Sequence, residues 1–195
     1  MENILDRGGE AFYFPEFFLA EESDRYFQEL LREIAWNQEP VKIFGKMLMQ
    51  PRLTAWYGDP GKPYRYSGIT MHPKNWTTPL LEIKQRIEKR SPALFNSALL
   101  NLYRDQKDHV GWHRDNEKSL GAQPVIGSVS FGATRRFLFR YYADKKIKRP
   151  LELTHGSFLL MQGQTQHFWE HCIPKQALAA GPRINITFRN IQEPV

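Results

Sequence analysis

The chain has 195 residues, a length that suits one domain with a substantial core, and we expect a single domain over residues 1–195. No apolar run approaches the ~18 residues that a membrane span needs, and the first residues lack the basic and apolar regions of a signal peptide. We therefore expect no membrane association and a cytoplasmic location. The single cysteine, Cys172, excludes an internal disulfide and fits a reducing compartment.

The net charge of +6 is unevenly distributed along the chain. Residues 1–39 hold ten acidic and three basic residues, whereas residues 135–149 hold seven basic residues and one acid, Asp144. A basic segment of this kind suits a polyanionic partner. From charge alone, a solvated hairpin loop that binds no partner is an equally good interpretation of this segment.

Two helices are expected in the N-terminal half. Ser23 is a candidate N-cap for the first helix, after which apolar residues recur with helical spacing. The second helix is expected to open at Thr78, with Pro79 at its first position, and to end at Pro92. The predicted buried faces comprise Tyr26, Phe27, Leu30, Leu31 and Ile34 in the first helix, and Leu80, Leu81, Ile83 and Ile87 in the second.

From about residue 97 the pattern changes to short runs rich in β-forming residues, broken by Gly and Pro. The runs are ALLNLY, VIGSVSFG, RFLFRYY, LELTHGSFLLMQ, HFWEH and RINITFRN. Several short strands with turn signals between them predict a sandwich or a closed barrel. The C-terminal half is therefore expected to be all-β, and the N-terminal half mixed.

A metal site is predicted around His113 and Asp115. On an extended chain these side chains point the same way, two residues apart, and can reach one ion together. A third ligand must come from elsewhere, and HFWEH offers His167 or His171. Two histidines and one carboxylate leave three positions open on an octahedral ion, which is typical of non-haem Fe(II) oxygenases, whereas a closed zinc site usually needs thiolates. We expect ordinary core or surface roles for His72, His109 and His155.

The last predicted strand offers an anion site. In PRINITFRN, polar residues alternate with apolar ones, so that one face of the strand carries a guanidinium near each end. Such a face is often simply exposed to solvent. Inside a small barrel it would bind a dianion such as a 2-oxo dicarboxylate through charge-assisted hydrogen bonds. The residues of this face are Arg183, Asn185, Thr187 and Arg189, and Asn101 and Tyr103 share a face of an earlier strand in the same way.

The segments HRDNE, SVSFGATRRFLFR, LTHGSFLLMQ and PRINITFR, in this order and spacing, resemble the AlkB family of Fe(II)- and 2-oxoglutarate-dependent nucleic-acid dealkylases. The resemblance covers roughly residues 40–190 and is closest to the animal members that repair duplex DNA. It implies a mainly β fold with flanking helices, built on a double-stranded β-helix, or jelly roll. The expected parts are an N-terminal helical extension over about 1–40, a nucleotide-recognition lid over about 41–75 and the dioxygenase core over about 97–192.

The resemblance also implies the site. Iron would be held by His113, Asp115 and His171, which leaves His167 with an ordinary role. The 2-oxoglutarate cosubstrate would be bound by Asn101, Tyr103, Arg183, Asn185, Thr187 and Arg189.

Residues 41–68 interleave aromatic with basic side chains, Trp56 and Tyr57 among the aromatic ones. This mixture suits bases and phosphates, although the segment alone favours an ordinary hairpin that packs its aromatics into the core. The resemblance reverses that preference: Phe44 would act as a wedge in the base stack, with Arg52 near the same gap. It further implies that the basic 135–149 hairpin binds the complementary strand or the nucleic-acid backbone. The other substrate contacts would come from Lys46, Tyr64, Tyr66, Ser67, Asn116 and Glu117.

The activity implied is oxidative demethylation of 1-methyladenine and 3-methylcytosine in DNA, in which 2-oxoglutarate and O2 give succinate, CO2 and formaldehyde. A carboxylate at Glu117 would favour these cationic bases over neutral ones. The alternative is a hydroxylase or demethylase with the same Fe(II) and 2-oxoglutarate site that acts on RNA, a protein or a small molecule. A non-catalytic reader of nucleic acid is a third reading. The expected partner is alkylated DNA, with RNA second, and the expected form is a monomer in a bacterial cytoplasm.

Overall fold

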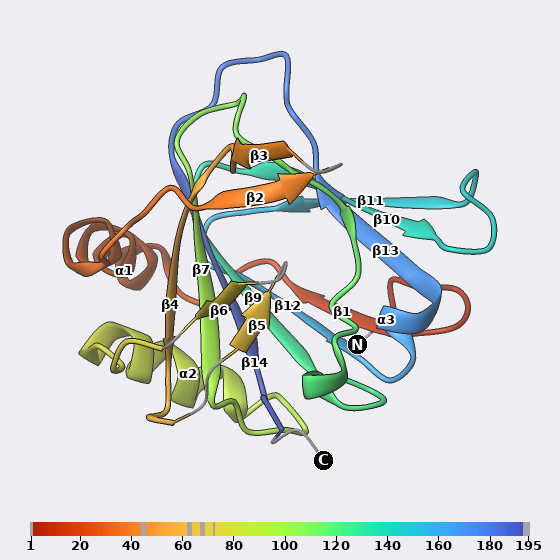
Figure 1. Cartoon of the computed structure of the whole chain (residues 1–195), viewed down its shortest axis with the longest axis horizontal. Helices are drawn as coiled ribbons and strands as arrows, with labels where there is room; N and C mark the ends of the chain where they lie inside the picture. The colour runs from red at the N-terminus through yellow and green to blue at the C-terminus, as the bar shows by residue number, and fades with distance from the viewer. Residues whose placement is uncertain (1, 44–45, 62–63, 67–68, 72, 193–195) are drawn as a thin grey trace.

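Two antiparallel sheets form the body of the protein (Figure 1). The computed structural model describes residues 2–43, 46–61, 64–66, 69–71 and 73–192. The larger sheet has the order β1-β12-β9-β14-β7-β4, and the smaller has the order β11-β10-β13-β8. The larger sheet comprises β1 (Glu10–Phe14), β4 (Leu53–Gly58), β7 (Ser97–Tyr103), β9 (Ile126–Gly132), β12 (Ser157–Gln162) and β14 (Arg183–Arg189); the smaller comprises β8 (Val110–His113), β10 (Arg135–Tyr141), β11 (Lys148–Leu153) and β13 (Trp169–Ile173).

The helices and two short hairpins complete the chain. The helices α1 and α2 cover one face of the six-stranded sheet, to the left in Figure 1, and α3 leads directly into β13. Each hairpin pairs only with itself among the described residues. The bounds are α1 (Ala20–Glu33), α2 (Thr78–Glu88), α3 (Thr165–Phe168), a 3-10 turn (Lys118–Leu120), and the hairpins β2 (Pro40–Ile43) with β3 (Lys46–Met49) and β5 (Tyr64–Tyr66) with β6 (Ile69–Met71).

The two faces of the larger sheet belong to two different cores. Its outer face packs on the helices and contributes Tyr57, Val129 and Ile186. Its inner face meets the smaller sheet, from which Phe137 and Trp169 enter the space between the sheets. This double layer of antiparallel strands confirms the expected jelly roll, and the space between its sheets is where a site can lie.

The strand β4 lies inside the stretch expected to form the lid. It pairs with β7 along its whole length, and both of its faces are buried. Tyr57 packs against the helices and Trp56 against the inner core, at 4% and 3% exposed. The proposal that these two aromatic rings serve bases is therefore wrong, because a strand covered on both faces buries all its side chains.

The N-terminal segment is more than a helical extension. Residues Glu10–Phe14 form β1, which pairs with β12 at the edge of the larger sheet. No strand was expected in this segment. The first 40 residues thus supply an edge strand as well as a covering helix.

Helix α1 begins earlier than its sequence suggests. The expected N-cap, Ser23, is buried inside the helix, where its hydroxyl donates to the Phe18 carbonyl at 3.3 Å. The N-cap position is Leu19, whose backbone N–H donates to the Glu22 carboxylate at 3.1 Å. A carboxylate in the first turn satisfies an otherwise unpaired N–H and favours the earlier start. The predicted apolar face is confirmed, since Tyr26, Leu30 and Ile34 are buried.

Helix α2 is shorter than expected. Thr77, not Thr78, is its N-cap residue, and the helix ends at Glu88 rather than at Pro92. The Glu88 carboxylate accepts the Phe95 N–H at 2.7 Å, so the chain folds back onto the end of the helix within seven residues. Leu81 is 38% exposed and therefore lies outside the buried face that was predicted for it.

None of the helices in the described part of the chain combines the length and the apolar character that crossing a bilayer requires.

Gly132 is the last residue of β9, where the chain turns toward β10, and the backbone there requires a glycine. Its φ is +88°, and a Cβ there would collide with the Pro182 carbonyl oxygen and the Phe27 ring. We expect Gly132→Ala to lower the free energy of unfolding by about 2 kcal/mol or more, because strain at positive φ adds to the collision. Urea unfolding followed by circular dichroism measures the change.

Gly111 supplies the matched control, because a Cβ there meets nothing within 4 Å. Gly111→Ala is expected to change stability by less than about 0.5 kcal/mol. Equal losses in the two variants would contradict the proposed role of the turn.

Candidate functional site

Three predicted ligands come together between the sheets. His113 ends β8, Asp115 follows two residues later, and His171 lies opposite His113 on the neighbouring strand β13. The candidate ligand atoms of these side chains all lie within 4.8 Å of one another. His171 rather than His167 completes the group, because the ring of His167 contacts the Ala122 carbonyl outside it. The group offers two nitrogens and a carboxylate, which suits Fe(II) with open positions.

The protonation states of the buried members suit metal binding. Burial opposes ionisation of Asp115, but the Arg189 guanidinium, with His171 and His113, lowers its pKa to about 2. Burial, with His113 beside it, lowers the pKa of His171 to about 3. At neutral pH the carboxylate is therefore ionised and the His171 imidazole is neutral, which are the forms that bind a metal.

Contacts around the group hold its members in place. Arg189 donates from Nη2 to Asp115 Oδ1 at 2.9 Å, and the Asp115 backbone N–H donates to Gln166 Oε1 at 2.9 Å. His113 Nδ1 lies 2.9 Å from the Gly111 carbonyl oxygen. An N–H must donate there, so Nε2 of His113 is the nitrogen left to bind a metal.

The predicted anion-binding residues line the same cavity as the metal group. Strand pairing places Arg183 opposite Tyr103 and Asn185 opposite Asn101, so β14 and β7 present their polar faces to one space. Strand β9 adds Ser128 to this wall. All six predicted residues line the cavity: Asn101, Tyr103, Arg183, Asn185, Thr187 and Arg189.

Arg183 is the residue of this wall best suited to bind an anion. Its side chain is 1% exposed, and burial lowers its pKa to about 10, so the guanidinium stays charged at neutral pH. Nη2 donates to Ser130 Oγ at 2.9 Å, whereas Nε and Nη1 have no hydrogen-bond partner among the described residues. A buried cation with free donors fits a carboxylate of 2-oxoglutarate.

Asn185 and Thr187 are partly engaged within the wall itself. Asn185 Nδ2 donates to Ser128 Oγ at 2.9 Å, and the Thr187 hydroxyl donates to Asn185 Oδ1 at 3.1 Å. These contacts fix the orientation of both side chains, which favours a rigid wall over an adaptable one.

The predicted substrate residues differ in their exposure and in their position relative to the cavity. Asn116 is exposed, and Glu117 is half-buried with Oε2 buried and without a hydrogen-bond partner in the described part of the chain. Arg52 is 5% exposed and lines the cavity. The backbone places Lys46 in β3 and Tyr64 and Tyr66 in β5, while Phe44 and Ser67 lie outside the described residues.

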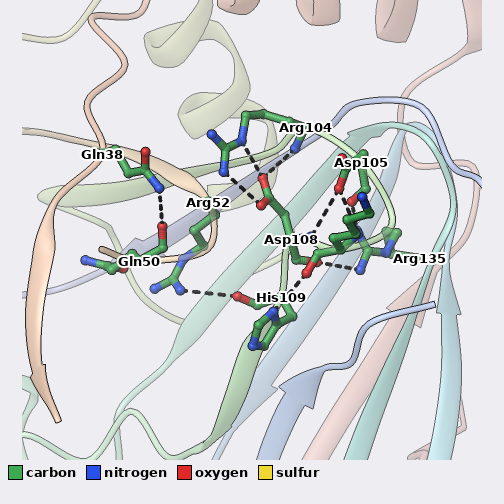
Figure 2. Close-up of polar contacts among 9 residues, drawn as sticks. Gln38, Gln50, Arg52, Arg104, Asp105, Asp108, His109 and Arg135 are labelled. Atoms are coloured by element: carbon green, nitrogen blue, oxygen red, sulfur yellow. Dashed lines mark hydrogen bonds and ion pairs between the residues drawn. The ribbon is translucent and has the colours of Figure 1, made fainter. Parts of the chain in front are cut away.

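The basic hairpin β10–β11 uses much of its charge internally. Arg135 is fully buried and donates to the carbonyl oxygens of Asp105, Asp108 and Pro174 at 2.9, 2.8 and 2.9 Å; Figure 2 shows the first two. Three more bases form ion pairs: Arg140 and Lys145 with Glu170, and Arg149 with Asp6. The expected grip on a nucleic acid is therefore wrong for Arg135, which stabilises the fold.

Two features of the site were missed. Ser128 and Ser130 alternate with Val129 and Phe131, the same pattern that identified β14, so the sequence contained a signal for them. Gln166 carries no such signal. It reaches Asp115 only because α3 packs beside the loop that follows β8.

Comparison with known proteins finds a family model that matches most of the chain. A family model described as the 2OG-Fe(II) oxygenase superfamily matches residues 10–189. The solved structure titled "The structure of OsALKBH1" aligns with a TM-score of 0.62 over 95% of this chain and 99% of that chain, at 18% sequence identity. This structural likeness supports the fold.

Curated relatives are closer in sequence. The chain is 44% identical over 188 residues to alpha-ketoglutarate-dependent dioxygenase alkB homolog 3 of Bos taurus, covering 91% of this chain and 64% of that protein. It is 40% identical over 181 residues to DNA oxidative demethylase ALKBH2 of Homo sapiens, covering 87% and 69%, and 37% identical over 211 residues to the Arabidopsis thaliana protein of that name, covering 95% and 67%. These relatives come from animals and a plant, so they do not support the bacterial source expected from the sequence.

Removing the His171 side chain should weaken metal binding strongly. We expect His171→Ala to weaken Mn(II) or Co(II) binding at least about 100-fold, since a ligand contributes no less than the outer partners that support it. Isothermal titration calorimetry measures the change. His109→Ala is the matched control, because His109 bonds the Lys107 carbonyl and lies outside the group. Unchanged binding in His171→Ala would remove this residue from the metal site.

Cys172 should resist modification in the folded protein. The side chain is 4% exposed, and burial raises its pKa to about 11. A raised thiol pKa lowers the reactive thiolate fraction at every pH below it, and two pKa units correspond to about 100-fold. We expect iodoacetamide to label Cys172 at pH 8 at least about 100-fold more slowly in the native protein than in concentrated urea. Comparable rates by mass spectrometry would show that the thiol is accessible.

Proposed function

The chain belongs to the 2OG-Fe(II) oxygenase superfamily, and on that premise we propose that it is an Fe(II)- and 2-oxoglutarate-dependent dioxygenase that oxidatively demethylates alkylated bases in nucleic acid. The proposed substrates are 1-methyladenine and 3-methylcytosine in DNA. Iron would be held by His113, Asp115 and His171. The cytoplasmic location and the monomeric state stay predictions.

The observation that carries this proposal is the shared cavity. The three candidate metal ligands and the buried Arg183 line one space, and the two donors of Arg183 that lack a partner among the described residues suit an anion. A 2-oxo dicarboxylate satisfies both ends, because its 2-oxo acid chelates a metal while its distal carboxylate meets a guanidinium.

The choice of substrate rests on two further observations. The similar proteins include ones named DNA oxidative demethylase. Glu117, two residues beyond the candidate ligand Asp115, has a buried carboxylate oxygen without a partner among the described residues. Such an oxygen favours a cationic or N–H-bearing ligand, and a base methylated at a ring nitrogen that pairs with its complement carries a positive charge. RNA carries the same bases and is the alternative substrate.

The side chains of the cavity would have different roles in the reaction. Fe(II), when bound with 2-oxoglutarate and O2, would supply the oxidation of the N-methyl carbon, which would then leave the base as formaldehyde. Arg183 would orient the cosubstrate through its distal carboxylate, and Arg189 keeps Asp115 ionised and in position. The apolar residues Leu99, Phe137 and Ile173 line the same cavity and would limit the entry of water.

The proposal is tested with oligonucleotides that carry one methylated base. The protein, loaded anaerobically with Fe(II), is given 2-oxoglutarate and air with matched single- and double-stranded DNA containing 1-methyladenine or 3-methylcytosine. Mass spectrometry is expected to show loss of one methyl group with the wild type and none with His171→Ala. Arg183→Met is expected to raise the KM for 2-oxoglutarate at least about tenfold, because a charge-assisted bond contributes roughly 1.5–3 kcal/mol.

Different outcomes would reject different parts of the proposal. Turnover of 2-oxoglutarate with all DNA substrates unchanged would refute the DNA assignment and direct the assay to methylated RNA. An unchanged KM in Arg183→Met would show that another residue binds the cosubstrate.

A further inference from the structure

Arg52 occupies an unexpected place. It was predicted to lie beside the gap that a flipped base leaves in DNA, yet its side chain is 5% exposed and lines the candidate cosubstrate cavity. Its Nε donates to Asn101 Oδ1 at 2.7 Å, a buried hydrogen bond between β7 and the residue before β4. A second contact runs from Nη1 to the His109 carbonyl oxygen at 3.5 Å, as Figure 2 shows.

This hydrogen bond determines how the Asn101 carboxamide is turned. A guanidinium only donates, so the oxygen of the carboxamide must face Arg52. The NH2 group is then the part of Asn101 that can meet another ligand in the cavity. Two N–H donors suit a carboxylate, whereas the opposite orientation would present an oxygen and repel it.

The chain around Arg52 is itself held firmly. At the base of the β2–β3 hairpin, Gln38 Nε2 donates to the Gln50 carbonyl at 2.8 Å, and the Gln50 N–H donates to the Glu39 carbonyl at 3.0 Å. The His109 N–H donates to the Pro51 carbonyl at 3.1 Å. Figure 2 shows the side chains of this network around Arg52. Hydrogen bonds from two sides therefore fix the backbone at residues 50–52, and with it the position from which the Arg52 side chain extends toward Asn101.

We propose that Arg52 is a positioning residue for 2-oxoglutarate: it holds the Asn101 carboxamide with its N–H groups available to a cosubstrate carboxylate. The inference rests on the proposed function, because it assumes that Asn101 meets 2-oxoglutarate. A role at the base stack predicts an effect on nucleic-acid binding, whereas this role predicts an effect on cosubstrate binding when no nucleic acid is present.

The test measures 2-oxoglutarate binding to the Mn(II)-loaded protein by isothermal titration calorimetry without any oligonucleotide. We expect Arg52→Gln to raise the Kd for 2-oxoglutarate about tenfold, and Arg52→Lys to recover part of that loss because its ammonium group can still donate a hydrogen bond to Asn101 Oδ1. Circular dichroism and thermal melting verify that the variants fold. An unchanged Kd in a folded Arg52→Gln protein overturns the proposal.

A double-mutant cycle separates action through Asn101 from direct contact with the ligand. If Arg52 acts by orienting Asn101, adding Arg52→Gln to Asn101→Ala produces little further loss. Fully additive losses would show that Arg52 acts independently of Asn101 and would overturn the positioning role.

Two other variants distinguish the remaining explanations. Arg104→Gln is the matched control, because Arg104 braces the same 104–109 loop through Asp108 at 2.8 Å but does not line the cavity. An equal loss in Arg104→Gln would assign the effect to loop integrity and overturn the proposal. Arg183→Met tests the pocket itself: if it leaves the Kd unchanged, the proposed cosubstrate site fails, and if it alone weakens binding, only the role of Arg52 fails.

Discussion

The ion pair between Asp115 and Arg189 is the contact on which the site depends. It joins the loop after the smaller sheet's β8 to the end of the larger sheet's β14, at 2.9 Å, with both side chains almost fully buried. Neither charge can be removed alone without leaving the other in a low-dielectric space. The pair therefore keeps the carboxylate ionised, orients it toward the histidines and ties the two sheets together at the same point.

Hydrogen bonds between buried polar side chains also hold the wall of the cavity together. Strands β7, β14 and β9 are neighbours in the larger sheet, and their pairing brings Tyr103, Asn101, Arg183 and Asn185 onto its inner face. Burying so many polar groups is unfavourable unless each finds a partner. Several do so within the wall, but Nε and Nη1 of Arg183 have no hydrogen-bond partner among the described residues, so these two donors are the groups of the wall best placed to bind a ligand.

Much of this arrangement could be predicted because it follows local patterns. Period-two alternation in RINITFR placed the polar face of β14, and the spacing of His113 and Asp115 on an extended chain placed two candidate ligands side by side. Choosing His171 over His167 needed the family resemblance, since both occur in one short run. The strand β1 was missed because its aromatic sequence, EAFYF, has no clear polar face. Side chains on both of its faces pack against a hydrophobic core.

The fate of the charged residues could not be predicted from local patterns, because their partners lie far along the chain. Arg135 belongs to a run of seven bases, yet its acceptors come from loops 27 to 39 residues away, and Arg149 meets Asp6 from the N-terminal segment. Arg52 likewise was expected near the gap in a base stack, whereas the pairing of β4 with β7 brings it to Asn101. The number of basic residues in a segment sets an upper limit on the charge that can contact a nucleic acid. Ion pairs and buried hydrogen bonds with distant residues lower that number, and they appear only in the folded structure.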